Sequence, residues 1–324
     1  MKLVTFEDST RRGAKRIGAI AGDSIIDLNA ALACHLGDQA NAGRDSEMAN
    51  AAIPSDMVDF LSGGSASMDS AKQALENFSK YTKGLDGHPI AHPIAETRLL
   101  APLPRPASIR DTISFEGHMR AFERRTGKKT PDLWYDRPIY YKGNPASVVG
   151  PEAEIEWPGY AELLDYELEF GIIIGKTGRD IAESGARSHI AGYLIFNDFS
   201  ARDVIPGEVS ANLGPSKGKD FDTGNAMGPW LVTPDEIDPS NLAMTARING
   251  EVWSEGNSSD MYWTFAQMIA FISKNETLYP GDFIGSGTVE NGCGDEMDKW
   301  LSHGDVVELE VEGLGLLRNT IVRP

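Results

Sequence analysis

Three acidic residues, Asp165, Glu167 and Glu169, alternate with apolar or aromatic residues in a stretch that has the pattern of a β-strand. Alternate residues of a strand point to one face, so the three carboxylates are expected to lie close together. If the strand is exposed, solvent alone can accommodate three like charges on one face. The stretch continues into 172–174, three isoleucines, which predicts that the strand enters a core, where like charges need an electrostatic partner. Because no Cys or His lies nearby in sequence, oxygen ligands favour a hard ion such as Mg²⁺, Mn²⁺ or Ca²⁺ over zinc.

A second polar cluster, residues 197–203, follows directly after an apolar strand-like stretch. Two interpretations of Asp198 stay open: it is a helix N-cap, or it joins a metal site built by a neighbouring strand. Arg202, four residues later, either pairs with Asp198 or faces a cavity. These interpretations are compatible, because Asp198 can bind a metal while Arg202 faces the cavity.

Two further segments contain residues suited to binding or catalysis. Residues 215–224 form a Gly- and Lys-containing loop without the spacing of a phosphate-binding P-loop, so Lys219 is either a solvated charge or a fixed cation for an anionic substrate. His118, at the end of 111–118, is either structural or functional on the pattern alone. Glycines in 285–288 and 292–296 let the backbone approach a ligand, although turns explain them equally well.

Some chemistries are not expected. The chain shows no Ser nucleophile elbow and no Cys in a recognisable nucleophile motif, which disfavours covalent catalysis. The glycine-containing stretches around Gly292 and Gly315 do not form a dinucleotide fingerprint between a strand and a helix, so neither a nicotinamide nor a flavin is expected.

The 324-residue chain carries 30 Lys and Arg against 48 Asp and Glu, a formal net charge of −18. Its densest basic run, within 120–129, is too small to offset this charge, so neither nucleic acid nor a membrane surface is expected as a partner. There is no run of about 18 apolar residues, and the first residues have the pattern of a strand rather than of a signal peptide. With two cysteines, Cys34 and Cys293, a disulfide framework is not expected, and we predict a cytoplasmic protein.

The first hundred residues are predicted to form a small β-rich domain. A strand at 2–6 precedes a hairpin at 17–28 that turns at Gly22 and Asp23, and helices follow at 28–36, 55–61 and 67–81. Five prolines between 89 and 106 favour an extended connection. We therefore divide the chain into a small N-terminal domain, 1–100, and a catalytic metal-binding domain, 101–324.

The second domain has mainly strand patterns. Strands are predicted over 165–174, 193–197, 244–252 with a turn at Asn249 and Gly250, and 306–321, and helices over 184–190 and 264–273. Strands dominate without regular alternation of strand and helix. This favours an α+β fold, a mixed β-roll or barrel-like domain, over a doubly wound sheet.

The order of the motifs along the chain is more specific than any one of them. It contains an Asp-x6-His segment, Tyr-Tyr-Lys-Gly-Asn, Glu-Leu-Glu, Asn-Asp-Phe-Ser-Ala-Arg-Asp, Gly-Pro-Ser-Lys-Gly-Lys-Asp-Phe and Tyr-Pro-Gly-Asp-Phe-Ile-Gly-Ser-Gly-Thr. This series resembles the fumarylacetoacetate hydrolase family, in its longer two-domain type. The resemblance covers nearly the whole chain. The family includes C–C hydrolases, decarboxylases, dehydratases, lyases and tautomerases, so the resemblance is weaker for the substrate.

The resemblance implies a role for each matching residue. The metal ligands would be Asp111, Glu167, Glu169 and Asp198, with Mg²⁺ the expected ion and Mn²⁺ or Ca²⁺ possible. His118 would activate water, Glu296 would orient His118, and the cations Arg202 and Lys219 would hold the substrate and its developing negative charge. Tyr141 and Thr288 would contact the substrate.

Two departures from the family pattern affect the choice of substrate. In fumarylacetoacetate hydrolase proper a glutamine lies where Ile205 stands here, and a tyrosine where Ile113 stands. The loss of two polar contacts indicates that the substrate is an acyl or keto acid other than fumarylacetoacetate. The expected activity is divalent-metal-dependent cleavage of a C–C bond in an acylpyruvate or related diketo acid by a homodimer. A decarboxylase, dehydratase or tautomerase of a 2-keto acid is the alternative, and a non-catalytic metal- or ligand-binding protein is the alternative of another class.

Overall fold

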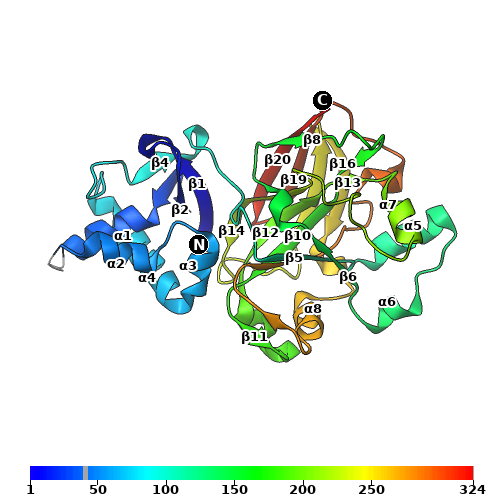
Figure 1. Cartoon of the computed structure of the whole chain (residues 1–324), viewed down its shortest axis with the longest axis horizontal. Helices are drawn as coiled ribbons and strands as arrows, with labels where there is room; N and C mark the ends of the chain where they lie inside the picture. The colour runs from blue at the N-terminus through cyan, green and yellow to red at the C-terminus, as the bar shows by residue number, and fades with distance from the viewer. Residues whose placement is uncertain (39–42, 324) are drawn as a thin grey trace.

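The structure, a computed structural model, describes residues 1–38 and 43–323. Within them the largest sheet has eleven strands (Figure 1). In spatial order these are β4 (Ala91–Pro93), β3 (Ser24–Asp27), β2 (Ala14–Ala21), β1 (Lys2–Asp8), β14 (Asn225–Val232), β12 (Ile190–Asp198), β10 (Leu168–Ile174), β18 (Asp282–Gly285), β5 (Ser108–Thr112) and β6 (Tyr140–Gly143), with β7 (Val148–Val149) beside β14.

A second sheet packs against the middle of the first. Its strands, in spatial order, are β16 (Glu251–Asn257), β15 (Ala243–Ile248), β19 (Val306–Val311), β20 (Gly315–Val322) and β8 (Glu154–Glu156). Phe170 and Ile172 of β10 share a buried apolar cluster with Leu309 and Leu317 of this sheet. Two short pairs complete the strands: β9 (Leu164–Asp165) with β13 (Ser200–Ala201), and β11 (Gly178–Arg179) with β17 (Thr277–Leu278).

Helices lie around the sheets. In the first hundred residues they are α1 (Leu28–Gly37), α2 (Asp45–Ala52), α3 (Met57–Ser62) and α4 (Gly64–Asn77), and later α5 (Glu116–Thr126), α6 (Asp132–Asp136), α7 (Ile205–Ser210) and α8 (Phe265–Ile272). Thr264 caps α8 through a capping box with Gln267. The predicted α+β class is confirmed, and the sheets are open rather than closed into a barrel in the part of the chain that is described.

Both hairpins that were predicted from their turn residues are present. β2 and β3 are joined at Gly22, whose φ is +58°, and β15 and β16 at Asn249 and Gly250, whose φ values are +52° and +81°. Positive φ at both central residues is what a type I′ hairpin turn requires. The predicted helix at 184–190 is a 3₁₀-helix, Glu183–His189.

The first hundred residues are joined to the rest by backbone hydrogen bonding. β1 is antiparallel to β14, with Lys2 opposite Val232 and Leu3 opposite Leu231, so the sheet is continuous across the predicted boundary. The proline-containing stretch, 89–106, is not an extended connection along its whole length, because β4 lies within it and pairs with β3. The two-domain division stays a prediction.

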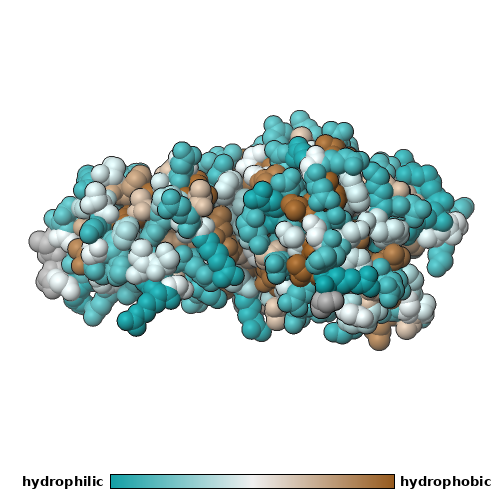
Figure 2. All heavy atoms as spheres, turned by 90° about the horizontal axis from the view of Figure 1, so that it is seen from above, coloured by the Kyte–Doolittle hydropathy of each residue, from teal (hydrophilic) through white to brown (hydrophobic). Residues whose placement is uncertain are grey.

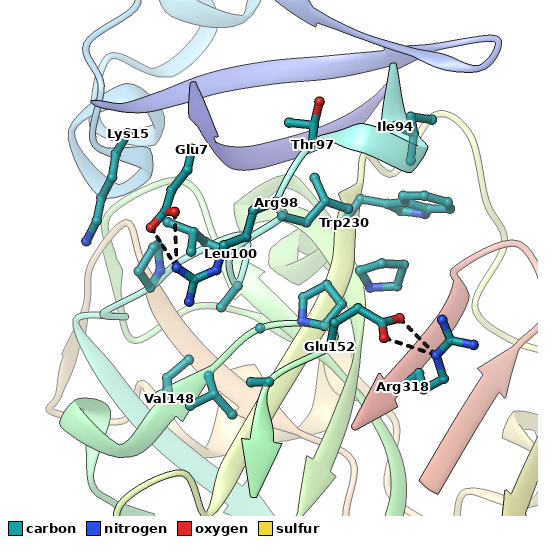
Figure 3. Close-up of a pocket in the computed structure, with 18 of the residues that line it drawn as sticks. Glu7, Lys15, Ile94, Thr97, Arg98, Leu100, Val148, Glu152, Trp230 and Arg318 are labelled. Atoms are coloured by element: carbon teal, nitrogen blue, oxygen red, sulfur yellow. Dashed lines mark hydrogen bonds and ion pairs between the residues drawn. The ribbon is translucent and has the colours of Figure 1, made fainter. Parts of the chain in front are cut away.

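A pocket of about 800 Å³ lies where these two parts of the chain meet (Figure 3). Its walls carry two ion pairs, Glu7 with Arg98 and Glu152 with Arg318. None of the site residues predicted from the sequence, all of which are described, lines this pocket. The predicted site is therefore elsewhere in the molecule.

The face of the molecule seen in Figure 2 is mostly polar. From above, Figure 2 shows a mainly hydrophilic surface in which hydrophobic residues are scattered. Among the helices in 1–38 and 43–323, none is long and apolar enough to cross a membrane.

Candidate metal centre and catalytic site

Neighbouring strands of the large sheet bring distant residues together. Asp198 ends β12, Glu169 lies on β10, Asp111 on β5 and Tyr141 on β6. These strands follow one another in the order β12, β10, β18, β5 and β6, and β18 ends at Gly285 between the carboxylates of its neighbours. The other face of β10 carries Leu168, Phe170, Ile172 and Ile174 into the core. The face that carries Glu169 also buries Ile173 in a second apolar cluster, so the carboxylates lie among strands that are buried on both faces.

Three of the carboxylates form a compact buried cluster. Asp111, Glu169 and Asp198 each offer an oxygen, and the three oxygens lie within 4.8 Å of one another. The backbone N–H of Gly287 donates to Glu169 Oε2 at 3.1 Å and to Asp111 Oδ1 at 3.3 Å, and the Thr288 hydroxyl donates to Glu169 Oε1 at 3.2 Å. Asp198 Oδ1 is buried and has no hydrogen-bond partner among the described residues.

The electrostatics of this cluster disfavour three ionised carboxylates without a neighbouring cation. Burial and the charge of Asp198 raise the pKa of Asp111 well above its usual range, and burial and the charge of Asp111 do the same to Glu169. Burial also raises the pKa of Asp198 to about 6. Oxygen-only donors, close spacing, burial and an unpartnered acceptor fit a hard divalent ion such as Mg²⁺ or Mn²⁺.

Glu167 lies beside this cluster but is paired with cations. Its carboxylate accepts from Arg202 Nη2 at 2.6 Å and from Lys219 Nζ at 2.5 Å, and the same Nζ lies 2.5 Å from Asp198 Oδ2. The carboxylate oxygens of Glu167 and Asp198 are therefore no more than twice 2.5 Å apart. Burial alone would raise the pKa of Glu167, but the charges of Lys219 and Arg202 outweigh it and lower this pKa to about 2. The role of Glu167 as a metal ligand stays a prediction.

The predicted continuous strand over 165–174 is wrong. The strand is interrupted between β9 and β10, and Asp165 belongs to the short pair with β13. Its carboxylate accepts from Arg202 Nε at 2.8 Å and from the backbone N–H groups of Gly294 at 2.8 Å and Asp295 at 3.0 Å. Asp165 therefore holds Arg202 and a loop in place instead of lining one face with Glu169.

Lys219 is buried rather than solvated. Besides its two carboxylate partners it donates to the backbone oxygen of Asp198 at 3.2 Å, and these charges outweigh burial, so the pKa of Lys219 rises. Ile205, at the start of α7, lies against Gly218, because a Cβ on Gly218 would meet Ile205 Cγ1 at 2.3 Å. The side chain that replaces the family's glutamine thus packs on the Lys219 loop.

His118 lies on α5, a helix that the sequence patterns did not predict. Its Nδ1 contacts Glu296 Oε1, and Glu296 Oε2 accepts from the backbone N–H of Asn291. Glu296 is in a 3₁₀-helix, Gly294–Met297. The His118 side chain is 20% exposed, so a small molecule can reach it. Cys293, whose sulfur lies within 4.8 Å of donor atoms of His118 and Glu296, forms a β-bridge with Glu167, which places this pair near Glu167.

Tyr141 and Thr288 lie at the carboxylates themselves. The Tyr141 hydroxyl donates to Asp198 Oδ2 at 2.6 Å, and burial and the neighbouring carboxylates raise the pKa of Tyr141 well above its usual value. Thr288 donates to Glu169. Both side chains line the site, and their contacts with a substrate stay predictions.

Two residues missed in the sequence also shape the site. Asn197 Oδ1 accepts the backbone N–H of Glu167 at 3.0 Å, which holds the segment between β9 and β10. Glu208 of α7 accepts from the backbone N–H groups of Ser216 at 2.8 Å, Lys217 at 2.7 Å and Gly218 at 3.2 Å, and from the Ser216 hydroxyl at 2.8 Å. A carboxylate that gathers successive N–H groups fixes a loop, but no local pattern marks such a residue.

Glu208→Ala is expected to lower kcat about tenfold, because charge-assisted hydrogen bonds to the loop are worth on the order of 1.5–3 kcal/mol, part of which keeps Lys219 in position. Steady-state kinetics measure this effect. Glu255→Ala, at an exposed position on β16, is the matched control. Equal activity of the two variants would show that the Lys219 loop needs no such support.

Gly285→Ala is expected to displace a carboxylate of the cluster. A Cβ at this position would meet Asp111 Oδ1 at 2.2 Å, far inside van der Waals contact. We therefore expect metal affinity to fall at least about tenfold, with the protein still folded. Calorimetric titration with Mn²⁺ and circular dichroism measure the two quantities. Gly185→Ala, where a Cβ meets nothing within 4 Å, is the control; unchanged affinity in Gly285→Ala would contradict the placement of Asp111.

Comparison with known proteins agrees with the geometry. The family described as "Fumarylacetoacetate (FAA) hydrolase C-terminal" matches residues 108–322. Oxaloacetate tautomerase FAHD2A, mitochondrial, of Bos taurus is 32% identical over 99% of this chain and 92% of its own length. 2,4-didehydro-3-deoxy-L-rhamnonate hydrolase of Sphingomonas sp. (strain SKA58) is 38% identical over 57% of this chain and 65% of its own length.

The fold is also shared with solved structures. Fumarylacetoacetate hydrolase from Exiguobacterium antarcticum superimposes with a TM-score of 0.73 and 26% identity, covering 100% of both chains. The motif order, the buried acidic cluster, the matching region and the full-length relatives agree. The chain belongs to the fumarylacetoacetate hydrolase family.

Proposed function

We propose that this enzyme is a divalent-metal-dependent hydrolase that cleaves a C–C bond in an acylpyruvate or a related diketo acid. The observation that carries the proposal is the pairing of a partly exposed His118 with Glu296 near the buried carboxylate of Glu167. A base held by a carboxylate is what activation of water requires. A metal centre alone would serve a binding protein equally well.

The ion would be held by Asp111, Glu169 and Asp198, with Glu167 as a further ligand. In the described part of the site, five carboxylates, those three with Asp165 and Glu167, face the cations Lys219 and Arg202, so a divalent ion would improve the charge balance. When bound, Mg²⁺ or Mn²⁺ supplies a Lewis acid that draws charge away from the bond to be broken.

The side chains of this chain have separate tasks. His118 removes a proton from water as the oxygen attacks the distal carbonyl, and Glu296 holds the imidazole and stabilises its charged form. Lys219 and Arg202 stabilise the negative charge that develops on the substrate, and each such donor is worth about 3 kcal/mol. The proton on His118 then passes to the departing carbon. Thr288 and Tyr141 orient the substrate from the two sides of the cluster.

Tautomerisation of oxaloacetate is the second candidate. It is favoured by the full-length similarity to a protein named for that activity. The same base would move a proton between carbon and oxygen without attack by water, so no bond between carbons breaks. Decarboxylation or dehydration of a 2-keto acid would also use the metal without requiring the His118–Glu296 pair to activate water.

Turnover of a substrate panel tests the proposal. Acylpyruvates and oxaloacetate are supplied with Mg²⁺, loss of enol absorbance is followed, and the products are identified by mass spectrometry. Pyruvate and a carboxylic acid in equal amounts from an acylpyruvate support the hydrolase. Loss of oxaloacetate enol with no change in mass supports the tautomerase, and release of carbon dioxide supports a decarboxylase. Binding of these acids without any turnover would contradict enzymatic function.

Two properties of the whole protein stay predictions. A homodimer is expected, and light scattering on a sizing column measures it. A cytoplasmic location is expected from the sequence, whereas the name of the bovine relative refers to mitochondria. Imaging of the tagged full chain in its native cell distinguishes the two locations.

A further inference from the structure

A second group of potential ligands lies beside the carboxylate cluster and differs from it in chemistry. His118, Cys293 and Glu296 each offer a donor atom, and these atoms lie within 4.8 Å of one another. Cys293 is fully buried, and the Glu296 side chain is 5% exposed. The His118 side chain, at 20% exposure, leaves a path from solvent. Nothing in the proposed reaction uses the thiol of Cys293.

The backbone around Cys293 is held firmly. Cys293 forms a β-bridge with Glu167, and the N–H of Leu168 donates to the oxygen of Gly292 at 2.8 Å. On the other side, Asp165 binds the N–H groups of Gly294 and Asp295. The thiol is therefore fixed relative to β10, and Glu296 follows in the same loop. His118 comes from a different element, α5.

The donor types select a different ion from that of the carboxylate cluster. A thiolate, an imidazole and a carboxylate are ligands of zinc, which binds them at about 2.0–2.3 Å and keeps a fourth position for water. Oxygen-only clusters instead favour Mg²⁺. Atoms already within 4.8 Å of one another need only a small closing movement to share one ion.

We propose that His118, Cys293 and Glu296 form an inhibitory Zn²⁺ site next to the Mg²⁺ site. On binding, the proton of the Cys293 thiol is released as the sulfur binds the ion, and the ion also binds one imidazole nitrogen of His118 and the Glu296 carboxylate, so Glu296 no longer holds the imidazole as a base for water. Zinc thus removes the base without displacing Mg²⁺. The inhibitory effect rests on the proposed function, whereas the existence of the site does not.

Cobalt spectroscopy tests the site independently of activity. Co²⁺ is titrated into the full chain at saturating Mg²⁺, and a thiolate-to-cobalt charge-transfer band is recorded. The band is expected in the wild type and in Cys34→Ser, which removes the other cysteine, and is expected to be absent from Cys293→Ser and Cys293→Ala. His118→Ala is expected to weaken Co²⁺ binding at least about tenfold. Absence of the band from the wild type, or its persistence in the Cys293 variants, would overturn the site.

Inhibition is measured separately. With a substrate from the panel and saturating Mg²⁺, the Zn²⁺ concentration for half inhibition is expected to rise at least about tenfold in Cys293→Ser relative to Cys34→Ser. A cobalt band without zinc inhibition would overturn the regulatory role. If no substrate is turned over, the proposed function has failed, and the cobalt spectra of the wild type and of His118→Ala still decide whether the site exists. Circular dichroism checks that each variant is folded.

Discussion

Glu169→Gln is expected to lower kcat/KM for the keto acid by at least about a hundredfold and to weaken Mg²⁺ binding in parallel. Glu169 lies at the centre of the acidic cluster, between Asp111 and Asp198 in the order of the strands. Its replacement by Gln removes the negative charge of the proposed ligand while keeping an oxygen that can accept from Gly287 or Thr288. The substitution keeps the shape of the site and changes its charge. Steady-state kinetics at varied Mg²⁺ concentration therefore measure the effect of the charge on turnover.

The same variant is expected to be more stable than the wild type when no divalent ion is present. The pKa of Glu169 is raised by burial and by the charge of Asp111, which means that its ionised form is disfavoured in the folded protein. A neutral Gln removes this cost. Thermal unfolding in EDTA is therefore expected to give a higher Tm for Glu169→Gln, and Mg²⁺ is expected to raise the Tm of the wild type more than that of Glu169→Gln.

Glu154→Gln is the matched control, because Glu154 is exposed on β8. It is expected to have wild-type activity, metal affinity and stability in EDTA. Wild-type turnover by Glu169→Gln, or a lower Tm of this variant than of the wild type in EDTA, would contradict the proposal that Glu169 is a buried carboxylate whose charge is balanced by a bound cation.

His118→Ala is expected to reduce hydrolysis about 10²- to 10⁴-fold while leaving metal affinity within about twofold of the wild type. General-base catalysis contributes this range, and His118 does not belong to the Asp111–Glu169–Asp198 cluster. Glu296→Gln is expected to lower kcat with little change in KM, because the amide keeps a polar contact with His118 but cannot stabilise the charged imidazole. Kinetics and calorimetry on the same preparations measure both quantities.

His303→Ala, at an exposed position, is the control for loss of a histidine. If His118→Ala keeps full hydrolytic activity, water is activated by another group and the mechanism is wrong. If His118→Ala loses hydrolysis but still exchanges a methyl proton of pyruvate with solvent, proton transfer at carbon does not need His118. In that case His118 acts on the attacking water alone.

The sequence predicted the parts of the fold that depend on neighbouring residues. Asn249 and Gly250 adopt the positive φ angles that specify their hairpin, and Thr264 with Gln267 starts α8. The family motifs led to residues on β5, β10 and β12, and the structure brings Asp111, Glu169 and Asp198 together. That convergence depends on the order of strands in the sheet, which no local pattern contains.

The failures had long-range causes. The strand over 165–174 is interrupted because Asp165 binds N–H groups at Gly294 and Asp295, far away in sequence. The helix that carries His118 is strongly polar and buries only Ala121 among its residues, so apolar periodicity could not identify it. Lys219 has the composition of a solvated loop residue, yet it is buried between Glu167 and Asp198, each from a different segment.

The most direct test of the account is calorimetric titration of Mn²⁺ into the wild type and into Asp111→Asn/Glu169→Gln. One ion per chain is expected in the wild type, and Mg²⁺ is expected to compete for it. The double variant, with a neutral acceptor at two of the three positions, is expected to show no binding at this site. Equal affinity and stoichiometry in the two proteins would mean that these carboxylates share no ion.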